Sequence, residues 1–271
     1  MQKLNNDYLS CAFSYLALEP EFNLFLIGDL EQYGMVHENV SCYTAKDWKA
    51  GMEFPFFILN YRGNVLVYSQ NPDYDAKTVA DFLMKINPDN ISGKDEILQK
   101  LIPYLENRVV KPTHLAKLSR IDSQQKERYK ELMERVRRLT EEDILAAYDL
   151  YITIDEFAYT YRRKTKEECY EDIRQNISAI GRSYGIFEGD KLISVVQTSA
   201  ENKKSAMVVG VATRNEMRGK GYARAAMLKL CQDCLKEKEF LCLFYDNPTA
   251  GKIYHSIGFE DMGKYTMIRK Q

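Results

Sequence analysis

The sequence predicts an α/β protein built on a mixed sheet, and three patterns support this prediction. An apolar, valine-rich run at residues 206–213 leads through a glycine-containing turn into residues 222–234, where apolar side chains recur at helical spacing. Residues 239–245 form a second apolar run of strand length, and the short helical segment after it ends at Gly258. Each half of the chain also contains a hairpin pattern. Strands and helices in this order are typical of α/β and α+β sheets.

In the N-terminal half, residues 54–60 and 65–69 predict a hairpin around a turn at residues 61–64. Helical segments are expected near residues 77–86 and 95–105, with a closing strand at residues 114–118. Between the hairpin and the first helix, residues 71–75 contain two aspartates and no glycine.

In the C-terminal half, a first strand is expected at residues 137–139, and Thr140 with the acids after it predicts the start of a helix that runs to about Tyr151. The remaining predicted elements are a helix at residues 166–176, a hairpin at residues 184–197 around Gly189-Asp190, and a last strand at residues 265–269.

The chain length of 271 residues favours two domains. We expect an N-terminal α/β domain at residues 1–121 and a second domain at residues 137–271. Residues 122–136 carry many charges of both signs, so they predict a solvated linker helix.

The charge balance directs attention to a pocket. With 38 basic and 39 acidic residues, the formal net charge is −1, which gives no field that would gather nucleic acid or an anionic membrane. Residues 1–7 lack a basic-then-apolar signal, and no run of about 18 uncharged apolar residues occurs. We therefore expect a cytoplasmic protein with no nucleic-acid or membrane partner.

The six cysteines are expected to be reduced, because nothing in the sequence indicates secretion. Cys231 and Cys234 have the spacing of half a zinc site, but they lie on the apolar face of a predicted helix. No second pair completes a tetrahedral site, so we expect buried thiols and no metal.

The turn between the valine-rich strand and its helix has the composition of an anion-binding loop. Gly219 and Gly221 carry no Cβ, so the backbone can turn sharply and place its amides against a ligand. The first amides of a helix lack intrahelical acceptors, and the helix dipole favours negative charge there. A phosphate or pyrophosphate group is the expected ligand.

The spacing Arg218-x-x-Gly221-x-Ala223 resembles the pyrophosphate loop of the GNAT acyl-CoA N-acyltransferase superfamily. The resemblance implies a GNAT fold in the C-terminal half, a loop that holds the pyrophosphate of acetyl-CoA, and a preceding strand whose backbone pairs with the pantetheine arm. The residues that this resemblance assigns to the coenzyme are Val211, Ala212, Thr213, Arg218, Gly219, Lys220, Gly221, Tyr222 and Ala223.

A second GNAT signature is similar to the pattern around Asn247, Ala250, Tyr254 and Gly258-Phe259. By this resemblance Asn247 touches the coenzyme near the pantetheine, and Tyr254 binds there and acts as the general acid. A phenol with an ordinary pKa of about 10 is protonated at neutral pH, so it can donate a proton to a departing thiolate. Packing of the helix onto the sheet is the other interpretation of Tyr254.

Two other interpretations apply to the glycine loop. A dinucleotide-binding fingerprint requires a third glycine, but Arg224 stands at that position, and five residues separate Thr213 from Gly219. The loop does not fit the Walker pattern either. The two glycines could also serve as a simple turn between strand and helix, although that would leave the second signature unexplained.

Further catalytic groups are less well determined by the sequence. The backbone N–H of Val211 is the expected oxyanion donor, with Gly210 allowing a local bulge. The strand itself carries no carboxylate, so the general base is left open among Glu201, Asp155, Glu156 and a water chain.

The sequence thus predicts an N-acetyltransferase that moves an acetyl group from acetyl-CoA to a primary amine of an acceptor that it does not identify. The alternative is a non-catalytic acyl-CoA-binding or regulatory protein. The N-terminal half echoes the order of elements in the C-terminal half, so it predicts a smaller, degenerate GNAT-like domain. This domain would shape the acceptor cleft or form the contact of a homodimer.

Overall fold

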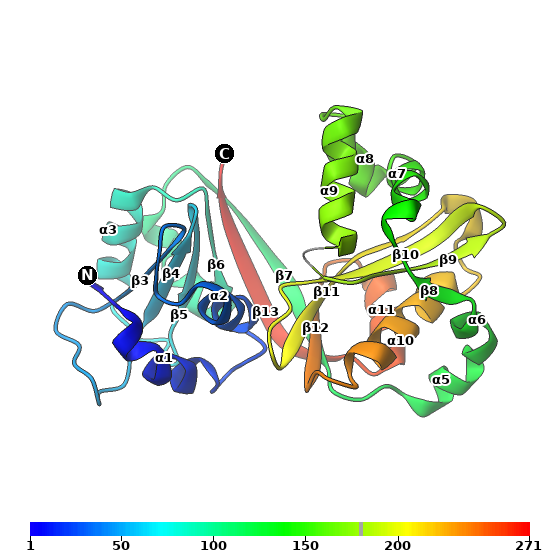
Figure 1. Ribbon diagram of the computed structural model, residues 1–271. Helices are drawn as coiled ribbons and strands as arrows, with labels where there is room; N and C mark the ends of the chain where they lie inside the picture. Colours follow the sequence, from blue (N-terminus) through cyan, green and yellow to red (C-terminus); the bar gives the residue numbers. More distant parts are fainter. Residues whose placement is uncertain (179–180) are drawn as a thin grey trace. The chain divides into compact units, whose positions relative to one another are not determined.

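The apolar runs of the sequence form strands and helices that pack into two units (Figure 1). The structure, a computed structural model, describes residues 1–178 and 181–271, without the side chains of Glu156 and Thr160. Unit 1 comprises Met1–Leu115 and Asp261–Gln271, and unit 2 comprises Ala116–Glu260. In the part of the chain that is described, no helix combines the length and apolarity that crossing a bilayer requires.

Unit 1 contains a mixed sheet with the strand order β1-β3-β4-β5-β6-β13. Neighbouring strands are antiparallel, except that β5 and β6 run parallel. The elements of this unit along the chain are β1 (Gln2–Lys3), a 3₁₀ turn (Asn6–Tyr8), α1 (Leu9–Leu16), α2 (Leu24–Tyr33), β2 (Val36–His37), β3 (Val40–Thr44), β4 (Phe57–Tyr61), β5 (Asn64–Tyr68), α3 (Ala76–Ile86), β6 (Asn90–Lys94), α4 (Asp95–Gln99), a 3₁₀ turn (Ile102–Tyr104) and β7 (Arg108–Leu118), which runs on into unit 2.

The predicted N-terminal hairpin is confirmed as β4 and β5. Arg62 and Gly63 form its turn, both with positive φ, which matches the right-handed twist of the two strands. The predicted helix at residues 95–105 is broken, because α4 ends at Gln99 and Pro103 lies in a separate 3₁₀ turn. The sequence analysis did not anticipate α1 and α2, whose apolar side chains cover one face of the sheet.

Strands β5 and β6 remain close together toward their carboxyl ends. Their parallel register runs from Asn64↔Asn90 to Leu66↔Ser92. One residue further along, a Cβ on Gly93 would stand only 2.3 Å from the carbonyl oxygen of Val67. The glycine therefore allows the two backbones to approach closely at this point.

The strands of unit 2 follow the order β12-β11-β10-β9-β8 in the mixed sheet. Only the β11–β12 pair is parallel. The elements of this unit along the chain are α5 (Ser123–Arg128), α6 (Lys130–Glu134), β8 (Val136–Arg138), a 3₁₀ turn (Glu141–Asp143), α7 (Ile144–Tyr151), α8 (Asp155–Tyr161), α9 (Lys166–Ser178), β9 (Ser183–Glu188), β10 (Lys191–Ser199), β11 (Ser205–Thr213), a 3₁₀ turn (Asn215–Met217), α10 (Tyr222–Cys234), β12 (Phe240–Tyr245), α11 (Pro248–Ile257) and β13 (Glu260–Lys270), most of which belongs to unit 1. This architecture confirms the predicted α/β fold with a mixed sheet.

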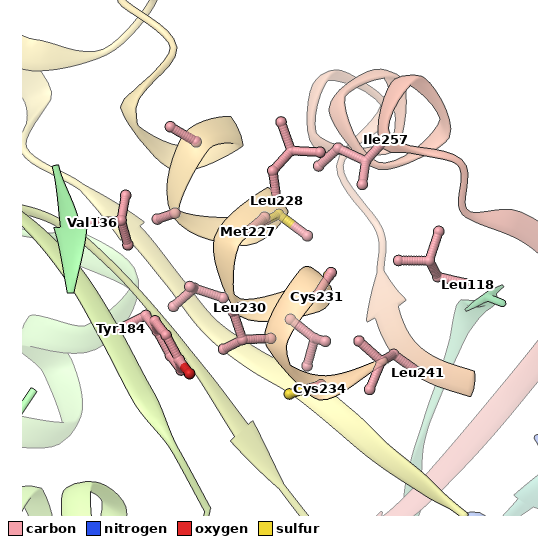
Figure 2. Packing of buried hydrophobic residues seen from close by; sticks show 14 of the residues in the cluster. Leu118, Val136, Tyr184, Met227, Leu228, Leu230, Cys231, Cys234, Leu241 and Ile257 are labelled. Carbon is pink, nitrogen blue, oxygen red and sulfur yellow. The ribbon is translucent and has the colours of Figure 1, made fainter. Parts of the chain in front are cut away.

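Helices cover both faces of the sheet in unit 2 (Figure 1). On one face, α10 and α11 bury a large apolar cluster against the strands, and Figure 2 shows Met227, Leu230 and Cys231 of α10 within it. Cys231 and Cys234 are both 0% exposed, and burial raises the pKa of each thiol. On the other face, α7 and α9 pack against β10.

The structure divides the chain differently from the expected domains at two places. The last strand, β13, was expected in the C-terminal sheet, but it pairs with β6 in unit 1 from Tyr265↔Lys94 to Arg269↔Asn90. A single strand pattern does not specify its partner, because pairing brings together residues far apart in sequence.

The expected solvated linker is two short helices, α5 and α6, separated at Tyr129. Met133 is 6% exposed, and Tyr129 and Leu132 also pack against the apolar cluster that contains α10. The segment is therefore part of unit 2 rather than a solvated connection.

The close approach at Gly93 predicts a specific instability. We expect Gly93→Ala to lower the free energy of unfolding by about 2–4 kcal/mol, because the new methyl group meets the Val67 carbonyl. Gly51→Ala is the control, since Gly51 has a φ of +91° and open space around its Cβ position, so it loses only about 1 kcal/mol to backbone strain. Urea denaturation measures both. Equal losses in the two variants would contradict the packing argument.

Candidate functional site

Strand β11 is distorted and partly unpaired at the position where the sequence predicts catalysis. Against β10, Val195 pairs with Ala212 and Gln197 with Val209, so Gly210 and Val211 together face the single residue Val196. Gly210 has a φ of +63°, which marks a β-bulge with glycine in the left-handed region. The bulge expected at Gly210 is thus present, next to the Val211 amide.

On its other edge, β11 loses its partner. The parallel register with β12 runs from Ser205↔Phe240 to Val208↔Leu243 and ends there. Beyond Val208, the second half of β11 has no registered partner in β12. Ligands of open α/β sheets bind beside the carboxyl ends of strands, where neighbouring strands diverge.

The predicted loop connects this end of β11 to α10, and its amides have no acceptors. Among the described residues, no hydrogen bond is donated by the backbone N–H groups of residues 219–224. The first bond of the helix is from the Ala225 amide to the Gly221 carbonyl at 2.9 Å, and no side chain caps the helix. Such unpaired donors at the start of a 13-residue helix favour an anion.

The two loop glycines have different roles. Gly219 has a φ of +79° and nothing within 4 Å of its Cβ position, so the place where a side chain would stand is open space. Gly221 has a φ of +88°, but a Cβ there would stand 2.6 Å from the ring of Tyr129. Gly219 thus leaves room in front of the loop, whereas Gly221 makes room for an aromatic ring behind it.

Both basic side chains of the loop are exposed and make no ion pair among the described residues. Arg218 donates from Nε to the Thr213 carbonyl at 3.3 Å, and the Lys220 ammonium lies 3.4 Å from the sulfur of Met217. The hydroxyl of Tyr222 donates to Glu188, and this hydrogen bond raises the pKa of the phenol. The exposed acid of the same loop, Glu216, is paired with Lys191 at 3.0 Å, so Arg218 and Lys220 are its exposed cations without a carboxylate partner among the described residues.

The strand residues assigned to the pantetheine arm differ in exposure. Val211 is half-buried and packs against the apolar cluster of α10 and α11. Ala212 is buried on the α7 face, where its carbonyl accepts a 2.8 Å hydrogen bond from Ser194 Oγ. The hydroxyls of Thr213 and Ser194 are 2.7 Å apart. Ala223, in the first turn of α10, is half-buried.

Helix α11 carries the second group of predicted residues. Asn247 is exposed and caps this helix, accepting from the Thr249 amide at 2.8 Å. Tyr254 is 9% exposed, its ring lies edge-on to Tyr245 with the centroids 5.8 Å apart, and burial raises the pKa of the phenol. Within the described residues its hydroxyl makes no hydrogen bond, so this buried ring keeps a protonated, uncommitted donor.

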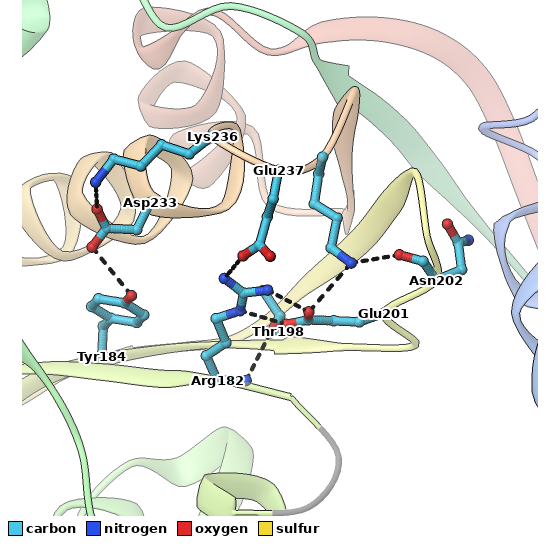
Figure 3. Close-up of polar contacts among 9 residues, drawn as sticks. Arg182, Tyr184, Thr198, Glu201, Asn202, Asp233, Lys236 and Glu237 are labelled. Carbon is cyan, nitrogen blue, oxygen red and sulfur yellow. Dashed lines mark hydrogen bonds and ion pairs between the residues drawn. The ribbon is translucent and has the colours of Figure 1, made fainter.

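The candidate base in the turn before β11, Glu201, is held in a structural network, shown in Figure 3. Glu201 accepts from Arg182 Nε at 3.0 Å and Nη2 at 2.7 Å, and also from the Thr198 hydroxyl. Lys238 adds its ammonium at 3.7 Å. Burial alone would raise the pKa of Glu201, but the hydrogen bonds from Arg182 and Thr198 outweigh it and hold the pKa below its ordinary value. A carboxylate engaged in this way is poorly suited to accept a proton.

The other two candidate bases lie on α8. Asp155, at its start, is exposed, and the side chain of Glu156 lies outside the described residues. Among the described residues, Asp155 makes no hydrogen bond or ion pair with β11, so it is not brought together with Tyr254 or Val211.

Two contacts near the loop were missed by the sequence analysis. Tyr129 packs behind Gly221, and Arg224 donates to the Tyr129 hydroxyl. Gln197 lies over the bulge, with Oε1 3.0 Å from the Cβ position of Gly210, and donates to the buried Tyr151. The only sequence signal for the first pair is an aromatic residue inside a charge-rich segment.

A cavity of about 510 Å³ also lies in unit 2, at the turn between β9 and β10. Its lining residues are Ala146, Asp149, Glu188, Asp190, Lys191, Leu192 and Arg214. Three acids against two bases make this cavity a poor site for phosphate groups.

A mixed sheet that opens at a bulged strand, with an anion-binding loop at that strand's end, defines the class of α/β fold to which this chain belongs. The chain is a member of the GNAT acetyltransferase family, whose model matches residues 77–268. Membership in this family, together with the fold, supports a general acyl-transfer function.

Solved structures show the same fold over the whole chain at low sequence identity. A GCN5-related N-acetyltransferase-like protein from Streptococcus suis is 13% identical with a TM-score of 0.59, covering 98% of this chain and 99% of its own. A GNAT-family acetyltransferase from Colwellia psychrerythraea is 12% identical with a TM-score of 0.56, covering 100% and 99%. A Drosophila protein is 12% identical with a TM-score of 0.62, covering 100% and 98%. No curated protein matches the sequence.

The Glu201 network predicts a pH-dependent contribution to stability. We expect Glu201→Gln to lower the free energy of unfolding at pH 7 by about 1–3 kcal/mol, because Arg182 loses its paired charge. The folded-state pKa of Glu201 lies below its ordinary value of 4.5, so this difference is complete above pH 4.5 and declines as the pH falls through the folded-state pKa.

Urea denaturation of both proteins between pH 7 and pH 3 measures the difference. Glu237→Gln is the matched control, since Glu237 also accepts from Arg182 but is 56% exposed, and we expect a loss of less than about 1 kcal/mol. A difference for Glu201→Gln that stayed constant down to pH 3 would show that its charge is not the cause.

Proposed function

We propose that this protein is an N-acetyltransferase that transfers the acetyl group of acetyl-CoA to a primary amine. The observation that carries the proposal is the opening of the sheet at the Gly210 bulge, beside a helix N-terminus whose amides have no acceptors. Membership in the GNAT acetyltransferase family supports the donor.

In this proposal the loop binds the pyrophosphate of acetyl-CoA. The unpaired amides of residues 219–224 donate to its oxygens, and Gly219 keeps the space in front of them free. Arg218 and Lys220, which are exposed and without a carboxylate partner among the described residues, add positive charge. Tyr222 and Ala223 provide the first helical amides. The backbone of residues 211–213 pairs with the pantetheine arm. Asn247 contacts the coenzyme through its side-chain NH2 group, because its side-chain oxygen already accepts the capping bond.

The reaction begins when the neutral amine attacks the thioester carbonyl. A C–N bond forms, the carbonyl π electrons move to oxygen, and the N–H of Val211 stabilises this oxyanion. The C–S bond then breaks, and its electron pair leaves with the thiolate of coenzyme A. Tyr254 donates its phenolic proton to that sulfur, and burial supports this role because it keeps the phenol protonated at neutral pH. The nitrogen that is now bonded to the acetyl carbon releases one proton to solvent, and the Tyr254 phenolate takes one proton back from solvent.

The ammonium form of the acceptor must lose a proton before it attacks, since an amine with a pKa of about 10.4 is mostly protonated at pH 7. Glu201 is engaged by Arg182, which argues against it as the base. Asp155 and a chain of water molecules are the routes that we propose instead.

A second function is favoured by one observation. Strand β11 carries no carboxylate, and the base that many acyltransferases use is therefore missing from it. A protein that binds acyl-CoA without transferring the acyl group would have the same loop. Thiol release from acetyl-CoA across panels of amines, peptides and aminoglycosides separates the two functions, because only an enzyme turns over.

The N-terminal unit repeats the same order of elements but lacks an anion-binding loop of this kind. Its hairpin β4–β5, helix α3 and parallel strand β6 correspond in order to β10–β11, α10 and β12. Asp75 caps α3 by accepting from the Thr78 amide at 3.0 Å, so a carboxylate occupies the position where an anion would bind. We propose that unit 1 is a GNAT-like domain that binds no coenzyme.

Removing the Tyr254 hydroxyl tests the acid. We expect Tyr254→Phe to lower kcat by about 100-fold or more while the dissociation constant of acetyl-CoA stays the same, because only proton donation is lost. Tyr245→Phe is the control, since the Tyr245 ring packs against Tyr254 and we expect its loss of kcat to stay within threefold, or about 0.7 kcal/mol. Steady-state thiol release and calorimetry measure these values. An unchanged kcat in Tyr254→Phe would remove Tyr254 from the mechanism.

Coenzyme binding tests the assignment of the pyrophosphate-binding loop to unit 2. Calorimetry with coenzyme A should give one site per chain, because the N-terminus of α3 is already capped by Asp75. We expect Gly219→Glu to weaken binding by about 100-fold or more, since a carboxylate enters the space in front of the amides. Gly51→Glu, with the same sign of φ and open space in unit 1, should bind normally. Two sites per chain would contradict this assignment.

A further inference from the structure

The cavity of about 510 Å³ at the turn between β9 and β10 has no role in the proposed acetyl transfer. All of its lining residues belong to unit 2. Helix α7 and the β9–β10 hairpin supply its walls, and Arg214, the residue after β11, completes them. Its volume is in the range of small-molecule sites. Among the described residues that line it are neither Val211 nor Tyr254, so a ligand here is separate from the proposed transfer centre.

Arg214 is a nearly buried cation whose charge has no counterion. The residue is 6% exposed, and its Nε donates to the Leu192 carbonyl at 2.7 Å. Among the described residues, neither Nη group makes a hydrogen bond or an ion pair, and neither is shielded from solvent. The Leu192 bond alone leaves the buried charge uncompensated, which costs free energy. The guanidinium therefore offers two donor groups in the cavity to an anionic ligand group.

Two exposed carboxylates line the same cavity. Asp149 lies on α7 and Asp190 in the turn of the hairpin, and neither makes a hydrogen bond or an ion pair among the described residues. Outside the cavity, Lys166 is influenced by the charge of Asp149, but its ammonium lies over the rings of Tyr148 and Tyr170, 5.7 Å from each centroid. Both carboxylates are therefore available to a cationic group in the cavity.

The other charged side chains of the cavity are already engaged. Lys191 pairs with Glu216 at 3.0 Å. Glu188 accepts from the Tyr222 hydroxyl and lies 3.9 Å from the Arg135 guanidinium. What remains for a ligand is one guanidinium and two carboxylates, so the complementary molecule carries one carboxylate and two cationic groups.

We propose that this cavity binds a basic amino acid. Its carboxylate accepts from the Nη groups of Arg214, whose planar pair of donors suits a carboxylate. Its α-ammonium and its side-chain cation lie against Asp149 and Asp190. A dicarboxylate would be repelled by the acids, and a diamine would leave the buried guanidinium without a counterion. Binding requires no acetyl-CoA, so its test is independent of the proposed acetyl transfer.

Calorimetry on the full chain without acetyl-CoA tests the ligand first. We expect L-lysine to bind with a dissociation constant of about 1 mM or below. Cadaverine is lysine without its carboxylate, and 6-aminohexanoate is lysine without its α-amino group. Each should bind about tenfold more weakly or worse, because each leaves one group of the cavity unpaired. These comparisons change the ligand alone, so they do not depend on the folding of a variant.

Variants then assign the two ends of the ligand. We expect Arg214→Gln to weaken L-lysine by about tenfold or more and not to weaken cadaverine, because only lysine has a carboxylate contact to lose. Asp149→Asn should weaken both ligands by about threefold or more. Glu142→Gln is the matched control, since Glu142 is an exposed acid just before α7 that does not line the cavity, and L-lysine should stay within about twofold. If Arg214→Gln does not fold, the comparison of lysine with cadaverine decides.

Three outcomes would overturn the inference. If L-lysine shows no binding at about 10 mM, the cavity is not an amino-acid site. If either analogue binds as tightly as L-lysine, the group that it lacks is not recognised and the assignment is wrong. If Asp149→Asn has no larger effect than Glu142→Gln, or if folded Arg214→Gln binds L-lysine as the unchanged protein does, lysine binds elsewhere.

Discussion

The point at which β11 and β12 stop pairing governs the arrangement of the site in unit 2. Up to Val208 the two parallel strands share a register, and beyond it they do not. The bulge at Gly210 and Val211 falls just after this point, so the backbone changes direction where it also loses a neighbour. The loop at residues 214–221 and the start of α10 follow directly, and the backbone groups near the opening are left for a ligand.

The two units have the same order of elements, but their parallel strands separate in unit 2 and stay together in unit 1. In unit 1, Gly93 lets β6 lie against the Val67 carbonyl, so the parallel strands stay together. Beside the ends of these strands, Glu19 accepts from the Tyr68 hydroxyl at 3.0 Å and pairs with Lys94 at 2.6 Å. In unit 1 the start of α3 is capped by Asp75, whereas in unit 2 the loop amides have no acceptors among the described residues.

Charge distribution separates the structural carboxylates of unit 2 from its binding surface. Glu201 and Asp143 are each bonded by an arginine, and the pKa of each carboxyl lies below its ordinary value. In the loop, Glu216 pairs with Lys191 at 3.0 Å, whereas the exposed Arg218 and Lys220 have no carboxylate partner among the described residues. The acids near the loop, Glu216 and Glu188, are thus engaged by Lys191 and Tyr222, and the two exposed cations are left without a carboxylate partner among the described residues.

Local patterns in the sequence determined the elements around the loop. The glycine turn, the strand before it and the helix after it are contiguous, so periodicity and turn residues were sufficient to predict them. The same is true of the bulge at Gly210, the hairpin turn at Arg62-Gly63 and the cap at Thr140.

Only the tertiary structure decided which distant residues meet. Sequence patterns could not pair β13 with β6, separate α5 from α6 at Tyr129, or place that tyrosine behind Gly221. They also could not show that Glu201 is committed to Arg182, because the two are brought together by strand pairing. A strand's period gives its faces and a loop's glycines give its conformations, but partners depend on packing between segments far apart in the chain.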